Sequence, residues 1–590
     1  MPVERLIPET VATPYGVVTL QVLIDGVLID PTVGILSITV VREINRIPTA
    51  TVVIRDGDGS IENFEQSESS RFVPGKRMEI KGGRDGHYQI LFKGIIVCQA
   101  IKVRNNQNTL TVESKDETVR MTIGRKNKYF TDVTDSDVMS QILGNYNATG
   151  TVESTTGQHA ELVQYHATDW DFMLMRAEAN GKLVIVNDGR VSVKAPNFET
   201  PILSVGFGAT LLEFDAEMDA RTQWQEVEAQ SWNYKNQELE VSSTSAINFR
   251  EHGNLTGATL AQSIAPPQYE MRHSGQLSSA EMDAWTKAAL LKSRMSKIRG
   301  RAKFEGTSVV NIGKWIEITG VGARFKGIAY ISGVRHEFVN GVWFTHAQFG
   351  MSPEWYASKG TISDFPAAGL TPSVSGLQIG VVVQLQSDPK GEDRILVKLP
   401  TLDSNAQGIW SRMACLDAGN DRGSFFRPEI GDEVILGFIN NDPREAIVLG
   451  QLNSSKNPAP LQAQDTNHLK GFFTRSKMKF QFDDEKSIIT LDTPGGNSLV
   501  IDDDAQTITL QDQTGNKIEM SPSGIKITSP KDISIEATGK IAAKATADAS
   551  LEGMNTTLKA SANLTVNGSA GVSVGSSGVT KVEGSLVKIN

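Results

Sequence analysis

The chain has 590 residues, of which 39% are hydrophobic and 21% charged, and its formal net charge at pH 7 is -10. That length predicts several domains rather than one. The acidic balance argues against a chain whose main task is to bind phosphate groups, so we expect no nucleic-acid partner. The two cysteines, Cys98 and Cys415, lie far apart and form no CxxC pair, so neither a disulfide framework nor a zinc site is expected.

We expect no signal peptide for general secretion, because the first residues of the sequence show no basic segment followed by a long apolar stretch. No run approaches the roughly 18 apolar residues that a membrane-spanning helix needs. We therefore expect the chain to stay in the cytoplasm after synthesis, unless a route other than general secretion carries it out.

The first zone of the sequence runs to about residue 365 and is mostly strand-like, as in 17–24, 50–54 and 89–92. Two helices are predicted to interrupt it. Thr168 can cap the first, with Asp171 at the capping-box position and Asn180-Gly181 at its end. The second is expected to begin near Ser278 and to carry, before Gly300, the apolar residues Met282, Trp285, Ala289, Met295 and Ile298.

A second zone follows at about 376–455, after a linker-like segment rich in Gly and Pro. This zone contains about five short strand-like runs, among them 380–383, 394–399 and 433–436, with Gly and Pro in the turns. Its size and pattern predict a small closed barrel of the OB type.

The tail carries the strongest pattern in the sequence, and its last aromatic residue is Phe482. Apolar residues recur there in pairs at i and i+2, which places both side chains of a pair on one face of a strand. From Ile525 onward the pairs follow one another in steps of 7 or 8 residues, and before it mostly in steps of 9 or 10. Fixed-period repetition of a short strand and a turn is typical of a β-solenoid.

One copy of this narrow strip gains too little from burial to fold alone, because ordering a residue costs about 1.5 kcal/mol and each buried apolar side chain returns roughly 2 kcal/mol. Three strips wound about a common axis can pair their strands with those of neighbouring chains, so we predict an intertwined homotrimeric β-helix. A single-chain β-helix and a flat meander are the alternatives, and strands this short disfavour the meander. The predicted trimer core consists of Ile525, Ile527, Ile533, Ile535, Ile541, Leu551, Leu558, Leu564, Val566, Val572, Val574 and Val582.

Several short motifs carry a resemblance that covers nearly the whole chain. They are FRPEIGDEV at 426–434 in the second zone, and NRIPTA at 45–50, ATDWDF at 167–172 and AEANG at 177–181 in the first. With these motifs and the repeating tail, the chain resembles the VgrG-type spike proteins of type VI secretion and related contractile injection systems. Those proteins resemble the fused hub and spike of contractile phage tails.

The resemblance implies a mainly β fold in three parts. These are a hub at 1–365 with two β-barrel subdomains and a few helices, an OB-fold domain at 376–455 and a triple-stranded β-helix at 470–590. It implies a structural spike that sits on the inner tube and baseplate, carries effectors and is driven through a target envelope by sheath contraction. Neither a lysozyme domain before the rod nor a toxin after it is expected, because 458–480 is short and the sequence given stops at Asn590.

No pattern of catalytic, cofactor-binding or metal-binding residues stands out, so we expect no enzyme activity and no cofactor. The run 56–60 resembles the start of a calcium loop, but Ile61 and Ser67 replace the Gly and Glu that such a loop needs, so we expect a turn. The acidic runs 483–485 and 502–504 are expected to be surface turns between strands. A trimeric phage-type adhesin or glycan depolymerase is the alternative function, and a cell-wall hydrolase a weaker one.

The octad pattern continues to the C-terminal residues of the sequence without a polar cap, which terminal solenoid repeats normally need. Exposed apolar side chains and open strand ends favour association with another protein. The resemblance implies a PAAR-type cone at this tip, a protein that commonly carries its own metal. Its expected contacts are Leu586, Val587 and Ile589 of all three chains.

Overall fold

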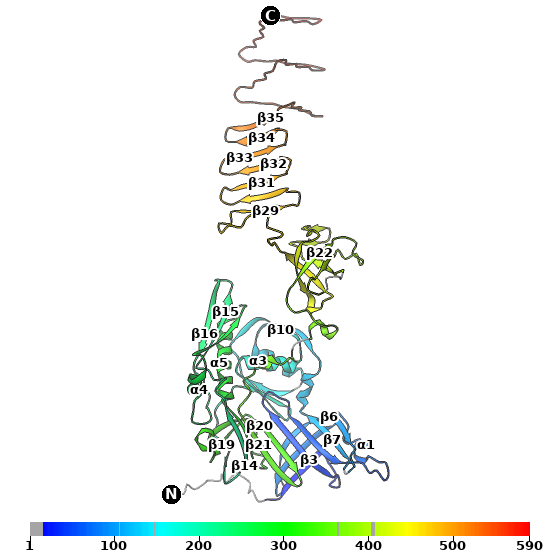
Figure 1. Cartoon of the computed structure of the whole chain (residues 1–590), viewed down its shortest axis with the longest axis vertical. Coiled ribbons are helices and arrows are strands. Elements are labelled where there is room, and N and C mark those ends of the chain that lie inside the picture. The colour runs from blue at the N-terminus through cyan, green and yellow to red at the C-terminus, as the bar shows by residue number, and fades with distance from the viewer. Residues whose placement is uncertain are drawn as a thin grey trace. The chain divides into compact units, whose positions relative to one another are not determined.

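The computed structural model describes residues 16–589, except 106, 147, 361, 363–364 and 403–406. The chain forms two compact units, one made chiefly of residues up to 378 and the other chiefly of the residues after it (Figure 1). Strands dominate both units, which confirms the prediction of a mainly β fold.

The N-terminal unit, here called the hub, is built on one sheet of 13 strands. Its main path runs β14-β18-β21-β20-β3-β4-β7-β6-β5-β1-β2, and β19 joins β13 to β20 beside that path. The bounds are β1 Val18–Ile24, β2 Val27–Leu28, β3 Ile35–Glu43, β4 Thr49–Arg55, β5 Arg77–Arg84, β6 His87–Lys102, β7 Thr109–Lys115, β13 Leu203–Gly206, β14 Leu211–Met218, β18 Ile298–Glu305, β19 Trp315–Thr319, β20 Gly327–Val339 and β21 Val342–Phe349.

This sheet surrounds two separate hydrophobic cores. One gathers the inward side chains of β1 and β3–β7, where every second residue is buried as a half-buried strand requires. The other gathers β13, β14, β18 and β19 around Trp315. The long strands β20 and β21 contribute side chains to both cores. Phe338 and Trp343 pack in the first core, and Tyr330 and Phe349 pack in the second. One continuous sheet links the two cores. The division of the hub into two β-barrel subdomains stays a prediction.

Three smaller sheets and several helices complete the hub. The sheets are β8 Lys126–Thr134 with β10 Gln158–Ala167, β9 Thr149–Val152 with β11 Leu183–Asn187 and β12 Arg190–Lys194, and β15 Glu226–Asn233 with β16 Glu238–Thr244 and β17 Gln268–His273. The helices are α1 Glu65–Glu68, η1 Glu117–Thr122, α2 Asp135–Gly144, α3 Asp169–Ala179, α4 Gly257–Ile264, α5 Ser279–Ser296, α6 Gly322–Phe325, η2 Tyr356–Ser358 and η3 Pro366–Gly369.

The two helices predicted from sequence are α3 and α5. The Thr168 hydroxyl accepts a hydrogen bond from the backbone N–H of Asp171 at 3.0 Å, which confirms the predicted cap. Helix α5 ends at Ser296, so the expectation that Ile298 belongs to it is wrong: Ile298 begins strand β18 and packs in a core of the hub. Helices α2 and α4 had not been expected.

Residues 378–451 form a closed five-stranded barrel, as predicted for the second zone. Its strands are β22 Gln378–Gln384, β23 Ile395–Lys398, β24 Ile409–Met413, β27 Glu433–Phe438 and β28 Ala446–Gln451, with the small hairpin β25 Ala418–Gly419 and β26 Arg422–Gly423 and the turn η4 Ile439–Asn441. The interior is filled by side chains such as Val397 and Val434, which are fully buried.

The tail begins with a seven-stranded antiparallel meander, here called the rod sheet. Its strands are β29 Leu469–Phe473, β30 Lys479–Asp483, β31 Ile488–Asp492, β32 Ser498–Asp502, β33 Thr507–Gln511, β34 Lys517–Ser521 and β35 Gly524–Thr528. The expectation that short strands disfavour a meander is therefore wrong for 469–528, because turns of two to five residues reverse the chain between strands. From 529 to 589 the described chain runs without a strand of its own, as the plain trace in Figure 1 shows.

Candidate oligomerisation surface

The rod sheet aligns the apolar pairs of its strands into two columns on one face. Directly opposed residues in an antiparallel ladder share a face, and the register places pair against pair across the strands. The first column is Phe472, Phe480, Leu491, Leu499, Leu510, Ile518 and Ile527, and the second is Phe482, Ile489, Ile501, Ile508, Met520 and Ile525. Sequence reasoning placed the trimer core from Ile525 onward, although the same pairs, at steps of 9 or 10, already signalled the earlier part of these columns.

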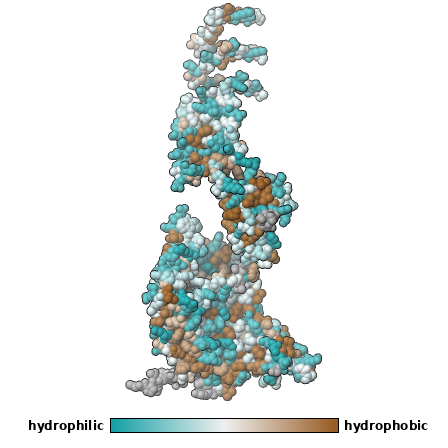
Figure 2. Space-filling model, in the orientation of Figure 1, coloured by the Kyte–Doolittle hydropathy of each residue, from teal (hydrophilic) through white to brown (hydrophobic). Residues whose placement is uncertain are grey.

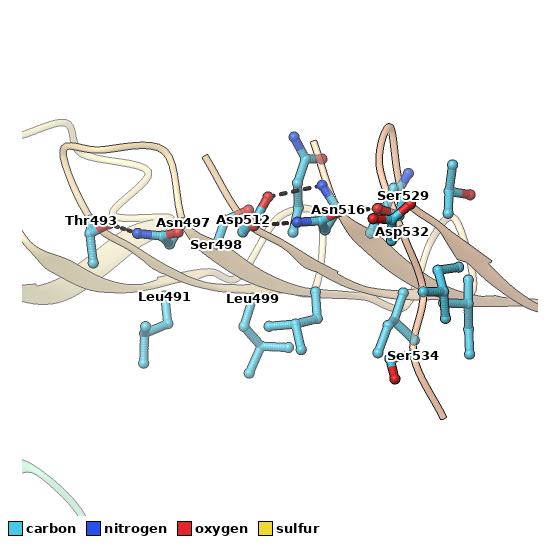
Figure 3. A pocket seen from close by; sticks show the side chains of 17 residues that line it. Leu491, Thr493, Asn497, Ser498, Leu499, Asp512, Asn516, Ser529, Asp532 and Ser534 are labelled. Atoms are coloured by element: carbon cyan, nitrogen blue, oxygen red, sulfur yellow. Dashed lines mark hydrogen bonds between the residues drawn. The ribbon is translucent and has the colours of Figure 1, made fainter. Parts of the chain in front are cut away.

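Among the residues that the structure describes, no second layer covers the columns. Leu491 is 48% exposed, Leu510 51% and Ile527 60%, and an open hollow lies along the first column. Figure 3 shows Leu491 and Leu499 on one side of the sheet, with Asp512 and Asn516 on the other side. Figure 2 shows hydrophobic residues at the surface of the rod sheet. A continuous apolar face of this kind is typical of a surface that meets another protein.

The opposite side of the rod sheet carries a polar turn network. The Asp512 carboxylate accepts hydrogen bonds from the backbone N–H groups of Thr514 and Asn516, each at 2.9 Å, and from the Asn516 side-chain amide at 2.7 Å. Donation by the Asn516 and Thr514 side chains lowers the pKa of Asp512 to about 2, so the turn keeps its charge in mildly acidic solution. The Ser529 hydroxyl donates to Asn516 at 2.6 Å and ties the next segment to this turn.

The predicted trimer-core residues lie on β35 and along the extended segment that follows it. Within one chain all twelve are between 55% and 75% exposed. The predicted tip residues are exposed as well, Leu586 at 73%, Val587 at 46% and Ile589 at 90%. Burying an Ile, Leu or Val side chain contributes about 1.5–3 kcal/mol, so the segment can gain stability from the cover of further chains.

The calcium-like run and the acidic run at 483–485 form turns. Asp58 accepts hydrogen bonds from the backbone and hydroxyl of Ser60, and the buried Asp56 accepts from backbone N–H groups of 57, 66 and 67, so the calcium-like run is a turn. Asp483 accepts from the backbone N–H groups of Glu485 and Lys486 between β30 and β31. Among the described residues, no group of three or more His, Cys, Asp or Glu side chains is placed to hold a metal ion.

His159 takes part in a buried ionic cluster that joins three helices of the hub. Arg176 on α3 binds Asp135 on α2 at 2.5 and 3.0 Å and Glu281 on α5 at 3.3 Å, and His159 lies 3.2 Å from Asp135. Asn180 donates to the same carboxylate at 2.8 Å. Burial opposes ionisation of Asp135, but the Arg176 guanidinium outweighs it and holds the pKa of that carboxyl below its usual value. The cluster links the three helices to one another.

Within the part of the chain that the structure describes, no helix is both long enough and apolar enough to cross a membrane.

Three family models match successive parts of the chain. The Alg8 N-terminal domain matches residues 14–340, the type VI secretion system/phage-baseplate injector OB domain matches 378–452, and the phage baseplate V C-terminal trimerisation domain matches 488–590. The last match includes all the predicted trimer-core residues and most of the two columns.

Two curated relatives share sequence with parts of the chain. The type VI secretion system spike protein VgrG3 of Vibrio cholerae is 32% identical over 105 residues, which are 16% of this chain and 10% of the relative. VgrG1b of Pseudomonas aeruginosa is 24% identical over 214 residues, 34% of this chain and 28% of the relative. The matched regions thus span a small part of each relative.

Solved structures of tail and secretion proteins match the chain at low identity. A prophage tail protein of Shewanella oneidensis has 9% identity and a TM-score of 0.44, and the match covers 57% of this chain and 98% of that one. An E. coli type VI secretion component has 12% identity and a TM-score of 0.37, with 73% of this chain and all of that one covered.

Proposed function

We propose that three copies of this chain form the structural spike of a contractile injection machine. The chain belongs to the Alg8 N-terminal domain family and carries a phage baseplate trimerisation domain. Its role is mechanical rather than catalytic. The observation that carries the proposal is the apolar face of the rod sheet, which continues into the exposed octads and is left uncovered by the described part of the chain.

Threefold symmetry would explain why the apolar face of the rod sheet is exposed in a single chain. Three rod sheets arranged around an axis turn their columns inward and their polar turn networks outward, so a prism forms without a second layer from any single chain. Residues 529–589 pair no strands within the chain, and the exposed octads supply the apolar pairs for an intertwined three-chain β-helix. Such a rod has few open strand edges along its length.

The same proposal assigns partners to the hub and to the C-terminal octads. The hub adapts the trimer to the inner tube and baseplate, and the rod pierces the target envelope with effectors as cargo. At the tip, Leu586, Val587 and Ile589 of three chains offer an exposed apolar surface to a PAAR-type cone. Deletion of 582–590 is expected to abolish co-purification with that cone. Retention of the cone at full occupancy would mean that it docks elsewhere.

Light scattering of the purified full chain tests the assembly. A trimer has three times the 64.0 kDa of one chain, and we expect that mass at micromolar concentration. A chain that ends at residue 461 lacks the rod sheet and octads and is expected to dissociate on dilution. A monodisperse full-length monomer would overturn the proposed function, whereas a truncated chain that stays trimeric would move the main interface to the hub.

A further inference from the structure

The first apolar column of the rod sheet does not begin in the rod sheet. Phe426, in the loop between β26 and β27 of the barrel, stacks on Phe472 of β29 with ring centroids 5.4 Å apart and an interplanar angle of 18°. Phe472 lies directly opposite Phe480, the next member of the column. Three successive aromatic rings therefore carry the column from the barrel into the rod sheet, within the same compact unit of the chain.

Residues 425–430, here called the barrel loop, are held in place by several contacts of the second unit. The Arg427 guanidinium pairs with Asp393 and lies over the ring of Phe425, 5.1 Å from its centroid. Glu429 accepts a hydrogen bond from Arg475 of the rod sheet's first turn at 2.8 Å. Pro428 is buried. A loop fixed in this way loses little conformational entropy when it binds a partner.

The barrel loop nevertheless displays large apolar side chains to solvent. Phe425 is 78% exposed and Ile430 is 66% exposed, while Phe426 remains 57% exposed beside Phe472. Its charged residues Arg427 and Glu429 already have partners within the chain, so the remaining surface is apolar. Rigid aromatic and aliphatic anchors surrounded by satisfied polar groups are typical of the centre of a protein–protein interface.

We propose that the barrel loop packs against a second copy of this chain, at the point where the columns of neighbouring copies meet the barrels. The argument for this occupant is continuity: the stacked rings make the loop an extension of the face that the proposed trimer buries. This inference rests on the proposed function. It adds an interface outside residues 488–590, the range matched by the trimerisation domain. The contact is heterologous and closes after three copies.

Substitution of the two most exposed anchors tests the inference in the full chain. We expect Phe425→Ala combined with Ile430→Ala to raise the concentration of half-dissociation of the trimer by roughly tenfold or more, because both substitutions remove interface anchors. Leu402→Ala is the control, since Leu402 is 72% exposed on the barrel outside the loop. The barrel itself should be unaffected, because the altered side chains lie outside its core.

The outcomes separate the two proposals. A wild-type chain that is monomeric would overturn the proposed function. A wild-type trimer whose dilution curve is the same as that of the double variant would overturn the barrel-loop interface alone.

Photo-cross-linking gives a second readout that does not depend on stability. With Phe425→p-benzoylphenylalanine in the full chain, irradiation of the purified trimer is expected to produce covalent dimers and trimers on a denaturing gel. The same probe at Leu402 should produce few. If the probe at 425 yields only uncross-linked or internally cross-linked chains, another protein or no protein covers this loop, and the inference is wrong.

Discussion

The hub and the rod sheet use the same local pattern with opposite results. In β3 the alternating residues Ile38 and Val40 are fully buried, whereas in β34 the alternating Ile518 and Met520 are 36% and 42% exposed. Both strands carry apolar residues at i and i+2 and pair with neighbours on both sides. The difference is that the hub sheet packs on cores formed by its own chain, while the apolar face of the rod sheet packs on no other described part of the chain.

Connection length explains why the rod sheet stays uncovered. Its turns have two to five residues, which is enough to reverse a strand but too short to bring another layer over the columns. The hub instead pairs segments far apart in sequence, such as β3 with β20. A strand pattern thus predicts which face is apolar, and the connections decide whether one chain or several chains cover it.

The largest expected effect comes from a charge placed in a column. We expect Leu491→Asp to prevent trimer formation, because a carboxylate cannot be buried there without a partner. Thr490→Asp is the matched control, since it lies next to Leu491 in β31 but on the opposite face. Light scattering of both variants checks this. Equal trimer content in the two variants would show that the columns do not form the interface.

The reverse experiment removes a core residue from the hub. Trp315 is fully buried, donates through its indole N–H to the Asn197 carbonyl at 2.9 Å and packs edge-on against Tyr330. We expect Trp315→Ala to lower the free energy of hub unfolding by about 3–5 kcal/mol. Thermal unfolding measures the loss, and light scattering should still show a trimer. A shift to monomers would mean that the hub core and the oligomeric contact are coupled.

Acidification should also act on the hub. Burial, with smaller effects of Arg42 and His346, lowers the pKa of His336 to about 3 from the usual value near 6.5. Between pH 7 and 5 the histidine of the unfolded chain takes up a proton, whereas folded His336 stays neutral. The free energy of unfolding should therefore fall as the pH is lowered, by about 2 kcal/mol between pH 7 and 5, with a slope that approaches about 1.4 kcal/mol per pH unit at the acidic end.

Thermal unfolding at pH 7, 6 and 5 measures this pH dependence, and His336→Gln should flatten it. His252, with a pKa lowered to about 4 chiefly by burial, leaves a remaining slope of the same sign. The chain after His468 has no histidine, and Asp512 stays ionised in this range, so trimer dissociation should change little. A pH-independent hub transition would contradict the assigned protonation of the two histidines.

Local signals predicted much of this fold. The Thr168 cap, the ends of α3 and the closed barrel follow from residues within a few positions of one another. Helix α2 was missed although Thr134 and Asp137 form a full capping box before it. The pairing of β3 with β20 could not be predicted, because no local signal specifies a partner almost 300 residues away.

The candidate oligomerisation surface was predicted only in part, because local patterns do not specify pairing partners. The i, i+2 pairs identify apolar faces in both halves of the tail, but they do not say whether a strand pairs with its own chain. Steps of 9 or 10 residues leave room for a reversing turn between five-residue strands, and the rod sheet forms there; the shorter octads leave less room. Phe426 has no place in any repeat, so only the structure reveals its stacking on Phe472.

The smallest expected effect sharpens the comparison most directly, because one substitution is made in both regions. Ile→Val removes one methylene and costs about 0.5–1.5 kcal/mol in a packed core. Ile54→Val lies in the fully buried hub core and should lower hub stability by about 1 kcal/mol per chain at every protein concentration.

Ile527→Val lies in the first column, where Ile527 is 60% exposed in one chain. If three chains bury it, the cost is similar per chain but appears in trimer dissociation, so the midpoint should depend on concentration. Thermal unfolding over a hundredfold range of concentration separates the two behaviours. An Ile527→Val chain that matches the wild type at every concentration would mean that Ile527 stays exposed in the assembly, and the column would have to end before β35.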